Sequence, residues 1–498
     1  MTRNALIIPY IILFLGLVAG PLDAQKRNLK IHEEQWNQIN AVVIKAYQEE
    51  DYEKGLQFAE IAYQYAEENL GKEHPDTLTS INNLALLYQA LNKLDKAEPY
   101  FKKAYELREK VLGKENPSTI HSLTHLATLY KTQNRLDEAE PYFLKALELT
   151  ETVFGLDDPK TLTVQKKLAE LYKDKGNLAK VGLLYKQILQ TSEKTFGKMN
   201  RETLAATNQL AAYYQAQGDN KEVEPLYLQA LDISESIHGK KHPETLKAMA
   251  NLGSFYQSKG NLRKAEPLFK DALDIHQKIQ GKEHPDTLKA MSNLALLYMA
   301  QGRNGQAGDL YQKALEISEK ILGKEHQDTL TATKNLASLY QSQKRYGEAE
   351  KLYKRAIEIA EKILGKVNPD TLATINHLAG LYNAQGRYGE AEDLVKSSLS
   401  LCEDELGKEH PNTLTVINNL GFLYETQGRF REAEINYKKA LDLRKKVLGS
   451  NHPDTLTSIN NLAFLYQSQG RHREAEPLYK EALLIKEKGL RRGGQIIP

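Results

Sequence analysis

A repeat of fixed length is the feature that most constrains how this chain can fold. Shifting the sequence against itself by 42 residues aligns nearly everything after the first segment without an insertion. A regular period of this size indicates an array of similar structural units, each of which contacts its neighbours. One threonine marks the period, at Thr77, Thr119, Thr161, Thr203, Thr245, Thr287, Thr329, Thr371, Thr413 and Thr455.

The repeats divide most of the chain into ten full units. We place their boundaries at 78–119, 120–161, 162–203, 204–245, 246–287, 288–329, 330–371, 372–413, 414–455 and 456–497. Residues 36–77 fit the same register loosely, with Trp36 and Gly71 at corresponding places, and we expect them to form a degenerate N-terminal capping repeat. The chain therefore contains about eleven units.

The apolar residues within one unit have the spacing of two helices. In the first full unit Leu78, Ile81 and Ala85 step by three and four residues, and Ala97 and Phe101 begin a second such series. Glycine follows the first series in most units, as expected for a residue that ends a helix in the left-handed conformation, and Lys344 is an exception. No stretch alternates in the manner of a strand. We predict an all-α fold, an α-solenoid of about eleven antiparallel helix pairs.

Large and small residues recur in a pattern that predicts close helix packing. Alanines at positions such as Ala85 and Ala104 let helices approach, and Tyr88 and Phe101 fill the space beside them. A tyrosine equivalent to Tyr88 occurs in all ten units. We expect buried rings with their hydroxyl groups hydrogen-bonded, and a ladder of exposed binding tyrosines is the alternative.

The first residues differ in composition from the rest of the chain. Arg3 precedes an uncharged stretch rich in Ile and Leu, and small residues ending at Ala24 form a cleavage-like site before Gln25. This order is typical of a secretory signal peptide. We predict a signal peptide at 1–24, a linker at 25–35, and export to a periplasm or the cell exterior, with a membrane anchor formed by residues 5–20 as the alternative.

Composition and charge exclude several classes of function. The 67 Lys and Arg residues nearly balance the 65 Asp and Glu residues, and no segment concentrates basic residues, so we expect no nucleic-acid partner. Cys402 is the only cysteine in the sequence, so no intrachain disulfide can form. We expect Cys402 to be a small helix residue without a role, the alternatives being a reactive thiol or an intermolecular disulfide.

The recurrent stretch GKEHPDTL at 71–78 could be taken for a phosphate loop or a metal site. A phosphate loop needs further glycines and a Ser or Thr after the lysine, and Glu73 stands there instead. Metal ligands must converge, whereas stacked helix pairs hold equivalent histidines about 8–10 Å apart or more. Within one junction His74 and Asp76 offer too few ligands. We therefore predict no metal, no cofactor and no enzyme activity.

The same junction residues suit the start of a helix. His74 has Asn, Asp or His counterparts in the other units, all of which can cap free backbone amides, and a proline follows in most of them. Pro75 would then occupy the first turn. We predict that the stretch is a turn between units.

The order Leu84, Ala85, Tyr88, Ala97, Phe101 and Ala104 resembles the tetratricopeptide repeat signature, and the 42-residue length resembles the repeat of kinesin light chains. The words HPDTLTSINNLALLYQ, LDKAEPYFKKAYEL and VLGKEN carry the closer match, across residues 74–488. This resemblance implies a superhelix whose concave groove, formed by the first helix of each pair, binds extended peptides or partner proteins. The coiled-coil segment that kinesin light chains have before their repeats is not found, which argues against motor attachment.

By the same resemblance we predict a peptide-binding groove. Its amides can hold the main chain of a ligand, and its apolar residues can anchor side chains. The predicted groove residues are Asn82, Asn83, Leu86, Asn251, Asn293, Leu296, Asn335, Asn376, Asn418, Asn419, Phe422, Asn460, Asn461 and Phe464. Units in the middle of the array carry His125, Lys167, Gln209 or His377 at the place of Asn83. The alternative is that the asparagines only bond neighbouring helices within the stack.

These observations predict a non-enzymatic scaffold that holds a protein or an extended peptide in its groove. Two other functions are open at the level of sequence: a cytosolic cargo adaptor similar to kinesin light chains, and a structural spacer or self-assembling rod whose groove stays empty. The repeat pattern sets neither the oligomeric state nor the identity of the ligand.

Overall fold

The computed structural model describes residues 21–491, and side chains from 26 to 485. Within this range the chain forms helices only, and no strand occurs among the described residues. The helices are α1 (Pro21–Gln48), α2 (Tyr52–Asn69), α3 (Pro75–Ala90), α4 (Leu94–Leu112), α5 (Pro117–Thr132), α6 (Leu136–Phe154), α7 (Pro159–Asp174), α8 (Leu178–Phe196), α9 (Arg201–Gln217), α10 (Asn220–His238), α11 (Pro243–Ser258), α12 (Leu262–Ile279), α13 (Pro285–Ala300), α14 (Asn304–Ile321), α15 (Gln327–Ser342), α16 (Tyr346–Leu364), α17 (Pro369–Ala384), α18 (Tyr388–Leu406), α19 (Pro411–Thr426), α20 (Phe430–Val447), α21 (Pro453–Ser468) and α22 (His472–Arg491).

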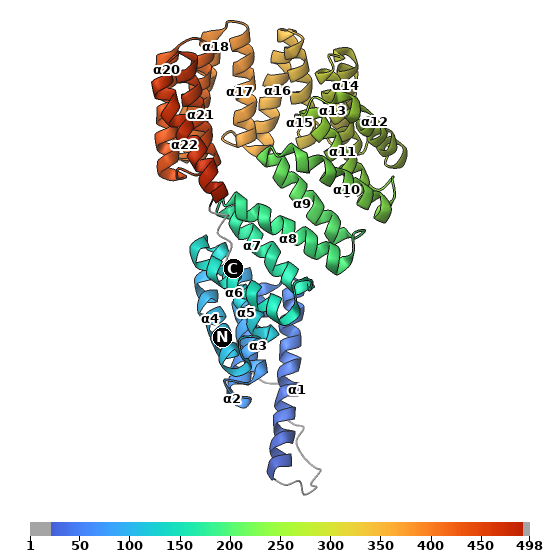
Figure 1. The fold of residues 1–498 in the computed structure, drawn as a ribbon, viewed down its shortest axis with the longest axis vertical. Helices are drawn as coiled ribbons and strands as arrows, with labels where there is room; N and C mark the ends of the chain where they lie inside the picture. The colour runs from blue at the N-terminus through green and yellow to red at the C-terminus, as the bar shows by residue number, and fades with distance from the viewer. Residues whose placement is uncertain (1–20, 492–498) are drawn as a thin grey trace, which may run out of the picture. The chain divides into compact units, whose positions relative to one another are not determined.

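The helices form an α-solenoid of eleven consecutive pairs, as the sequence predicts. The chain divides into two compact units, Met1–Leu171 and Tyr172–Pro498, with the division inside α7. Within each unit successive helices pack side by side, from α1 to α6 in the first unit and from α8 to α22 in the second (Figure 1). Successive first helices also contact each other, α1 with α3 in the first unit, and α11 with α13 and α19 with α21 in the second. At these places the first helices lie side by side, and the face that the first helices form is called the layer of first helices below.

The junctions between pairs confirm the predicted helix caps. The His74 ring accepts a hydrogen bond from the Asp76 amide, and Pro75 is the first residue of α3. Equivalent caps use Asn116 in α5 and His452 in α21. The recurrent threonine has a structural role here that the sequence alone did not reveal. In most junctions its hydroxyl donates to the carbonyl of the preceding glycine, over 2.7–2.9 Å, as at Thr77, Thr161, Thr203, Thr245, Thr287, Thr329, Thr371, Thr413 and Thr455.

The tight turn inside each pair needs a residue with positive φ. Most units place glycine there, for example Gly386 at φ 75°. Lys344, the exception noted in the sequence, adopts φ 60° at the same position. A lysine carries a Cβ and is strained in this region, so the turn geometry is imposed by the helices that flank it.

The recurrent tyrosine is buried in nine of the ten units, as predicted, and half-buried at Tyr340, and in several units it joins neighbouring pairs, although the Tyr214 hydroxyl has no hydrogen-bond partner. In those units the tyrosine hydroxyl donates to a glutamate on the preceding second helix, as Tyr382 does to Glu350 over 3.1 Å and Tyr466 to Glu434 over 3.0 Å. The same glutamates also form an ion pair with an arginine of the following turn; Arg387 lies 2.7 Å from Glu350. That guanidinium also lies 4.0 Å from the Tyr382 ring centroid. Each such group links two successive helix pairs.

The N-terminal segment differs from the sequence prediction. Residues 25–35, expected to be a linker, belong to α1. The reason is that side chains of this segment have partners on the next two helices: His32 bonds Tyr65 of α2 at 2.6 Å, and Glu33 lies 3.3 Å from His74 before α3. Trp36, 4% exposed, begins the buried part of the helix. The predicted signal peptide falls largely on residues 1–20, outside the described range.

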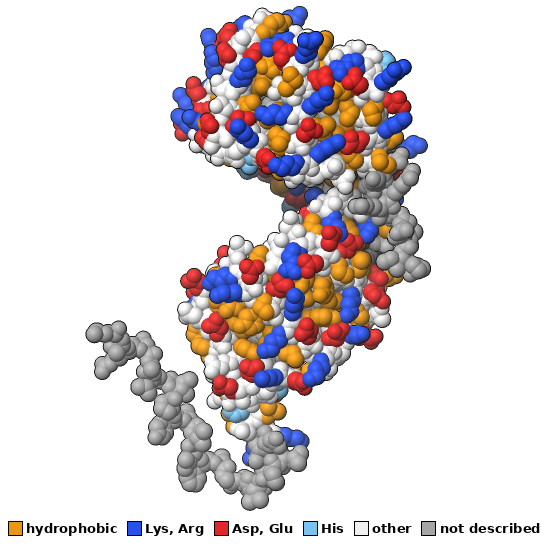
Figure 2. Space-filling view, turned by 90° about the vertical axis from the view of Figure 1, so that its left-hand side faces the viewer, with side chains coloured by type: hydrophobic (Ala, Val, Ile, Leu, Met, Phe, Trp, Pro, Cys, Tyr) orange, Lys and Arg blue, Asp and Glu red, His pale blue; other side chains and the backbone are white. Residues whose placement is uncertain are grey.

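The surface carries charges of both signs. Figure 2 shows Lys and Arg side chains interspersed with Asp and Glu over the visible face of each unit, with apolar side chains between them. Of the helices described, none has an apolar stretch long enough to cross a membrane. Cys402 is fully buried, and this burial raises the pKa of its thiol.

Candidate binding groove

The predicted groove residues all lie on the first helices of their pairs. Asn83 and its counterparts Asn251, Asn293, Asn335, Asn419 and Asn461 are half-buried in α3, α11, α13, α15, α19 and α21. The residue before this position ranges from Asn82 and Asn418, which are buried, through Asn376, which is half-buried, to Asn460, which is exposed. Three residues beyond it, Leu86 is half-buried, whereas Leu296, Phe422 and Phe464 are 43%, 55% and 58% exposed.

Some of these asparagines bond neighbouring first helices. The Asn83 amide donates to Asn40 of α1 over 2.9 Å, and Asn461 donates to Asn418 of α19 over 3.2 Å. At these two places the geometry matches the alternative, in which the amides stabilise the stack. A ligand would have to displace these bonds or use the second hydrogen of each amide group.

Three cavities open on the layer of first helices. The residues at the position of Asn83 line all of them: His125 and Lys167 in a cavity of about 590 Å³ between α3 and α7, Asn293 in one of about 420 Å³ between α11 and α13, and Asn335 and His377 in one of about 590 Å³ along α15 and α17. The repeat position selected from the sequence is therefore next to the hollows of the surface.

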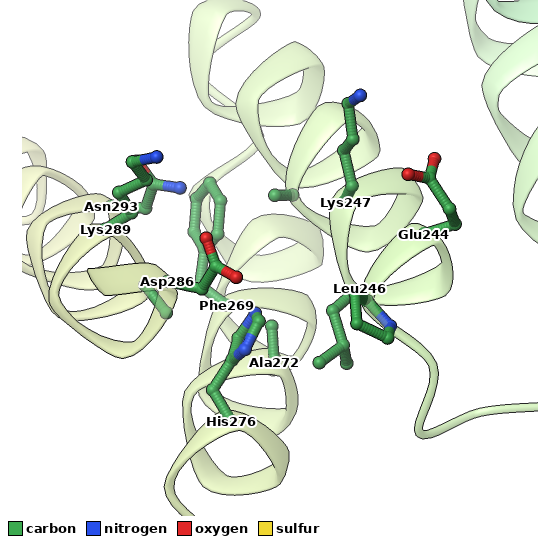
Figure 3. Close-up of a pocket in the computed structure, with 12 residues that line it drawn as sticks. Glu244, Leu246, Lys247, Phe269, Ala272, His276, Asp286, Lys289 and Asn293 are labelled. Atoms are coloured by element: carbon green, nitrogen blue, oxygen red, sulfur yellow. The ribbon is translucent and has the colours of Figure 1, made fainter. Parts of the chain in front are cut away.

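The cavity between α11 and α13 has a balanced set of charges (Figure 3). Glu244 and Lys247 come from α11, and Asp286 and Lys289 come from α13. His276 of α12 forms part of its floor, 8% exposed, with its Nδ1 2.7 Å from Gln280. Acidic and basic side chains thus face the same space.

The cavity between α3 and α7 occupies the equivalent place, four repeats earlier. Arg108 of α4 stands where His276 stands, His121 replaces Lys289, and Ser118 replaces Asp286. Lys160 and Lys167 of α7 complete its basic lining, and no Asp or Glu is among the described residues that line it. All of these residues belong to the first compact unit.

The floor position of these cavities was missed at the level of sequence. Among the units whose side chains are described at this position, most hold small residues, namely Ala66, Thr150, Ser192, Ser234, Ser318, Ala360 and Cys402, but three hold Arg108, His276 and Arg444. When the repeats are aligned, an Arg or His at a position that elsewhere takes Ala or Ser could have marked these cavities. The helix period alone does not show this, because most units have a small packing residue at the position.

The electrostatics of the α3–α7 cavity follow from its lining. The pKa of His125 is lowered to about 3 by burial, with further contributions from His121, Lys167 and Arg108. The same factors, burial first and then Arg108 and Lys167, lower the pKa of His121. His125 Nε2 and Asn82 Oδ1 are buried without a hydrogen-bond partner. The cavity is a region of positive potential with unpaired polar atoms.

One group of three potential metal ligands occurs in the described residues: Glu33, His74 and Asp76. The sequence predicted too few ligands within one junction, and α1 supplies Glu33 as a third. However, Nδ1 of His74 accepts the Asp76 amide hydrogen, which places the ring proton on Nε2, 3.3 Å from Glu33. Both ring nitrogens therefore have partners within the protein.

Comparison with known proteins identifies the repeat. The tetratricopeptide repeat model matches residues 42–110, 82–152, 118–194, 202–278, 248–305, 286–362, 370–446 and 418–488. The chain belongs to the tetratricopeptide repeat (TPR) family. Its matched segments cover most of the described residues, including every cavity described above. No curated protein matches the sequence.

Solved structures similar to this TPR array include kinesin-light-chain-like repeats. A Podosopora anserina protein with nearly identical TPR-like repeats of the kinesin light chain type is 29% identical, with a TM-score of 0.37, over 42% of this chain and 98% of its own. BtubC (BKLC) from P. vanneervenii is 22% identical, with a TM-score of 0.29, over 59% and 95%. A human IFIT1 dimer with PPP-AAAA is 18% identical, with a TM-score of 0.38, over 82% and 90%.

Proposed function

We propose that the protein is a non-enzymatic scaffold that holds an extended peptide or a partner protein along the layer of first helices. The observation that carries this proposal is a pair of exposed aromatic side chains at one repeat position. Phe422 of α19 and Phe464 of α21 are 55% and 58% exposed on helices that contact each other. Large apolar side chains exposed next to one another are typical of an interaction surface.

The surroundings of the two phenylalanines support the same function. Asn419 and Asn461 lie one helical turn before them on the same helices and are half-buried. An amide can donate and accept at once, so it can bond both groups of a peptide unit. Tetratricopeptide repeats generally mediate contacts between proteins and act without catalysis, which agrees with a surface of this kind.

The experiment replaces both phenylalanines and measures peptide capture. The immobilised protein is panned against a displayed library of random peptides, and the selected peptides are titrated against the variant Phe422→Ala/Phe464→Ala. We expect binding to weaken by about tenfold or more, because each buried aromatic anchor contributes roughly 1–2 kcal/mol or more. Ile435→Ala is the matched control, since Ile435 is 65% exposed on the second helix α20.

Two results would contradict the groove proposal. Selected peptides that bind the double variant as tightly as the original protein would place the binding surface elsewhere. A library that yields no peptide, together with concentration-dependent self-association of the purified protein, would favour the spacer or self-assembling rod. A cargo adaptor in the cytosol would bind peptides as well, and it is distinguished by the state of the N-terminus.

We also propose that the mature protein is exported. The support is the order of residues at the N-terminus, a basic residue, an apolar stretch and small residues before Gln25. N-terminal sequencing of protein purified from its native source is expected to begin at Gln25. Met1 or Thr2 at the start of the mature chain would contradict export through a cleaved signal and favour either an uncleaved anchor or the cytosolic adaptor.

A further inference from the structure

The cavity between α3 and α7 in the first unit is lined by basic side chains that the repeat fold does not need. Three side chains that carry positive charge line it, Arg108, Lys160 and Lys167, and two histidines, His121 and His125, join them. No carboxylate among the described residues lines the same space. The equivalent cavity between α11 and α13 is lined by two lysines and also by two carboxylates, Glu244 and Asp286, so the repeat framework is compatible with a neutral cavity.

Arg108 is the deepest of these groups, 7% exposed. Its Nη1 donates to the Ser118 carbonyl over 3.2 Å and to Ser122 Oγ over 2.7 Å, and its Nη2 is 3.5 Å from the Leu78 carbonyl. These partners are neutral. A guanidinium keeps its charge in proteins, and a buried charge without a counter-charge is costly. An anion in the cavity would remove this cost.

Two further polar groups of the cavity have an atom without a partner. Asn82 is 6% exposed, and its Oδ1 and the Nε2 of His125 are buried with no hydrogen bond. In the equivalent place near the other end of the array, Asn418 Oδ1 receives the Asn461 amide. His125 stands where Asn461 stands, and no amide of that repeat position reaches Asn82. Buried polar atoms without partners are rare and indicate a missing ligand or water.

A cation does not suit this arrangement. His121 and His125 are one helical turn apart, with ring centroids separated by 4.2 Å, a spacing that could hold a metal ion elsewhere. Here Arg108, Lys160 and Lys167 share the cavity, and their charges would repel it. The donors outnumber what one carboxylate can accept. Besides the five basic side chains, the hydroxyl group of Ser118 lines the space, whereas the hydroxyl groups of Thr79, Thr124 and Thr163 already donate to backbone carbonyls of their own helices.

We propose that this cavity binds a phosphate monoester dianion. Three terminal oxygens and a charge near −2 match the number of donors and the positive charge, with Lys167, Lys160 and Arg108 as the cationic partners. The cavity, about 590 Å³, is larger than a phosphate group, and Ile120, Val164 and Phe154 provide apolar walls. The organic part of the ester would lie against those walls.

The phosphomonoester has two possible sources, a free small molecule or a phosphorylated side chain of a bound polypeptide. The site does not depend on whether the layer of first helices holds a peptide. Calorimetric titration of the full chain in chloride buffer therefore uses three probes: inorganic phosphate, phenyl phosphate and a short peptide with one phosphotyrosine. The unphosphorylated peptide is the control for the third.

We expect one saturable site per chain for phenyl phosphate. Inorganic phosphate should bind more weakly, because it does not use the apolar walls. The variant Lys167→Gln should weaken binding about tenfold to a hundredfold, since a hydrogen bond to a charged group contributes roughly 1.5–3 kcal/mol. His125→Asn should also weaken it, by removing the ring Nε2, which has no partner within the protein and can donate to the anion. Lys289→Gln, in the charge-balanced cavity, and Arg444→Met should leave binding unchanged.

The outcomes separate cleanly. Tighter binding of the phosphopeptide than of phenyl phosphate assigns the site to a polypeptide, and the reverse assigns it to a small molecule. Absence of saturable binding of all three phosphates at millimolar concentration overturns the proposal. Binding that Lys167→Gln and His125→Asn leave unchanged, in variants whose helical circular dichroism equals that of the original protein, overturns it equally. Failure of random peptides to bind tests only the groove.

Discussion

Two buried arginines, eight repeats apart, occupy the same position in the repeat and have different surroundings. Arg444 of α20 donates to Thr415, Ser458 and the Asp454 carbonyl over 2.8–2.9 Å. Arg108 of α4 makes one bond of 2.7 Å and two longer ones. Burial lowers the pKa of both guanidinium groups, but only at Arg444 does a carboxylate, that of Asp454, oppose the shift.

The difference teaches how a uniform array acquires local chemistry. The helix pairs and the buried aromatic residue on the same helix as each arginine, Phe101 or Tyr437, are equivalent in the two repeats. A few side chains then decide whether the space beside the arginine is neutral or positive. In solenoids each repeat contacts only its neighbours, so such exchanges alter one site and leave the rest of the stack intact.

The largest expected effect removes what the two regions share. Phe101 and Tyr437 are both fully buried, and replacing either with alanine should cost about 3–5 kcal/mol of local stability, because a large cavity remains in the core. Amide hydrogen exchange measured by mass spectrometry should show faster exchange in α3–α6 for Phe101→Ala and in α19–α22 for Tyr437→Ala. A variant at exposed Phe430 is the control, with an expected change below about 0.5 kcal/mol.

Equal effects of these two variants on every helix of the chain would contradict local stability. The array would then unfold as one cooperative body, and its two regions would have no separate local stabilities to compare.

The second prediction separates the two arginines. Arg444→Met should cost about 2 kcal/mol, since three short hydrogen bonds from a charged donor are lost. Arg108→Met should cost about 1 kcal/mol or less, because relief of an uncompensated buried charge offsets its weaker bonds. Hydrogen exchange in α4 and α20 gives the two values. A larger loss at Arg108 than at Arg444, in phosphate-free buffer, would show that the first site is already charge-compensated.

The third prediction exchanges one residue between the regions. Asn461→His removes the donor to Asn418 Oδ1 and should cost about 1 kcal/mol. The reverse exchange, His125→Asn, gives Asn82 a partner and should stabilise α3 and α5 by about 0.5–1 kcal/mol. Both are measured as changes in exchange protection of the helices concerned. If the two substitutions change stability in the same direction, the unpaired state of Asn82 is not set by residue 125.

The repeat length and the two helix periods were enough to predict the fold from the sequence. They fixed the helix pairs, the capping role of His74 and the burial of the tyrosine series, because each depends on local chemistry that recurs ten times. The repeat pattern did not indicate that residues 25–35 belong to a helix, since α1 depends there on single contacts such as His32 with Tyr65 that do not recur.

The candidate sites were less predictable for the same reason. Comparison among repeats pointed to Asn293, Asn335, His125 and Lys167, which line cavities, but it could not distinguish these from Asn83 and Asn461, which bond the neighbouring helix. That distinction depends on which residue faces each amide from the adjacent repeat. Arg108 was overlooked because it departs from the pattern, and in a repeat protein such departures are where specific chemistry can be placed.

The smallest expected effect tests a feature that both regions share. Glu434 receives Arg471, Lys438 and Tyr466, and these hydrogen bonds, Arg471 first, lower its pKa from 4.5 to about 2. At Glu98 burial opposes the shift, but Lys102 and Arg135 outweigh it, and the pKa is again about 2. A carboxylate whose pKa is lower in the folded chain stabilises it fully above pH 4.5 and loses this contribution as the pH falls towards 2. Stability should therefore decline over this range in both regions.

Glu98→Gln or Glu434→Gln should make that decline smaller in the helices around the substituted residue. The change should be smaller than the stability change that Asn461→His causes, because both carboxylates are partly open to solvent. A pH series of hydrogen exchange gives the slope for α4–α5 and α20–α21, and unequal slopes in the original protein would mean that the shared frame itself differs between the two regions.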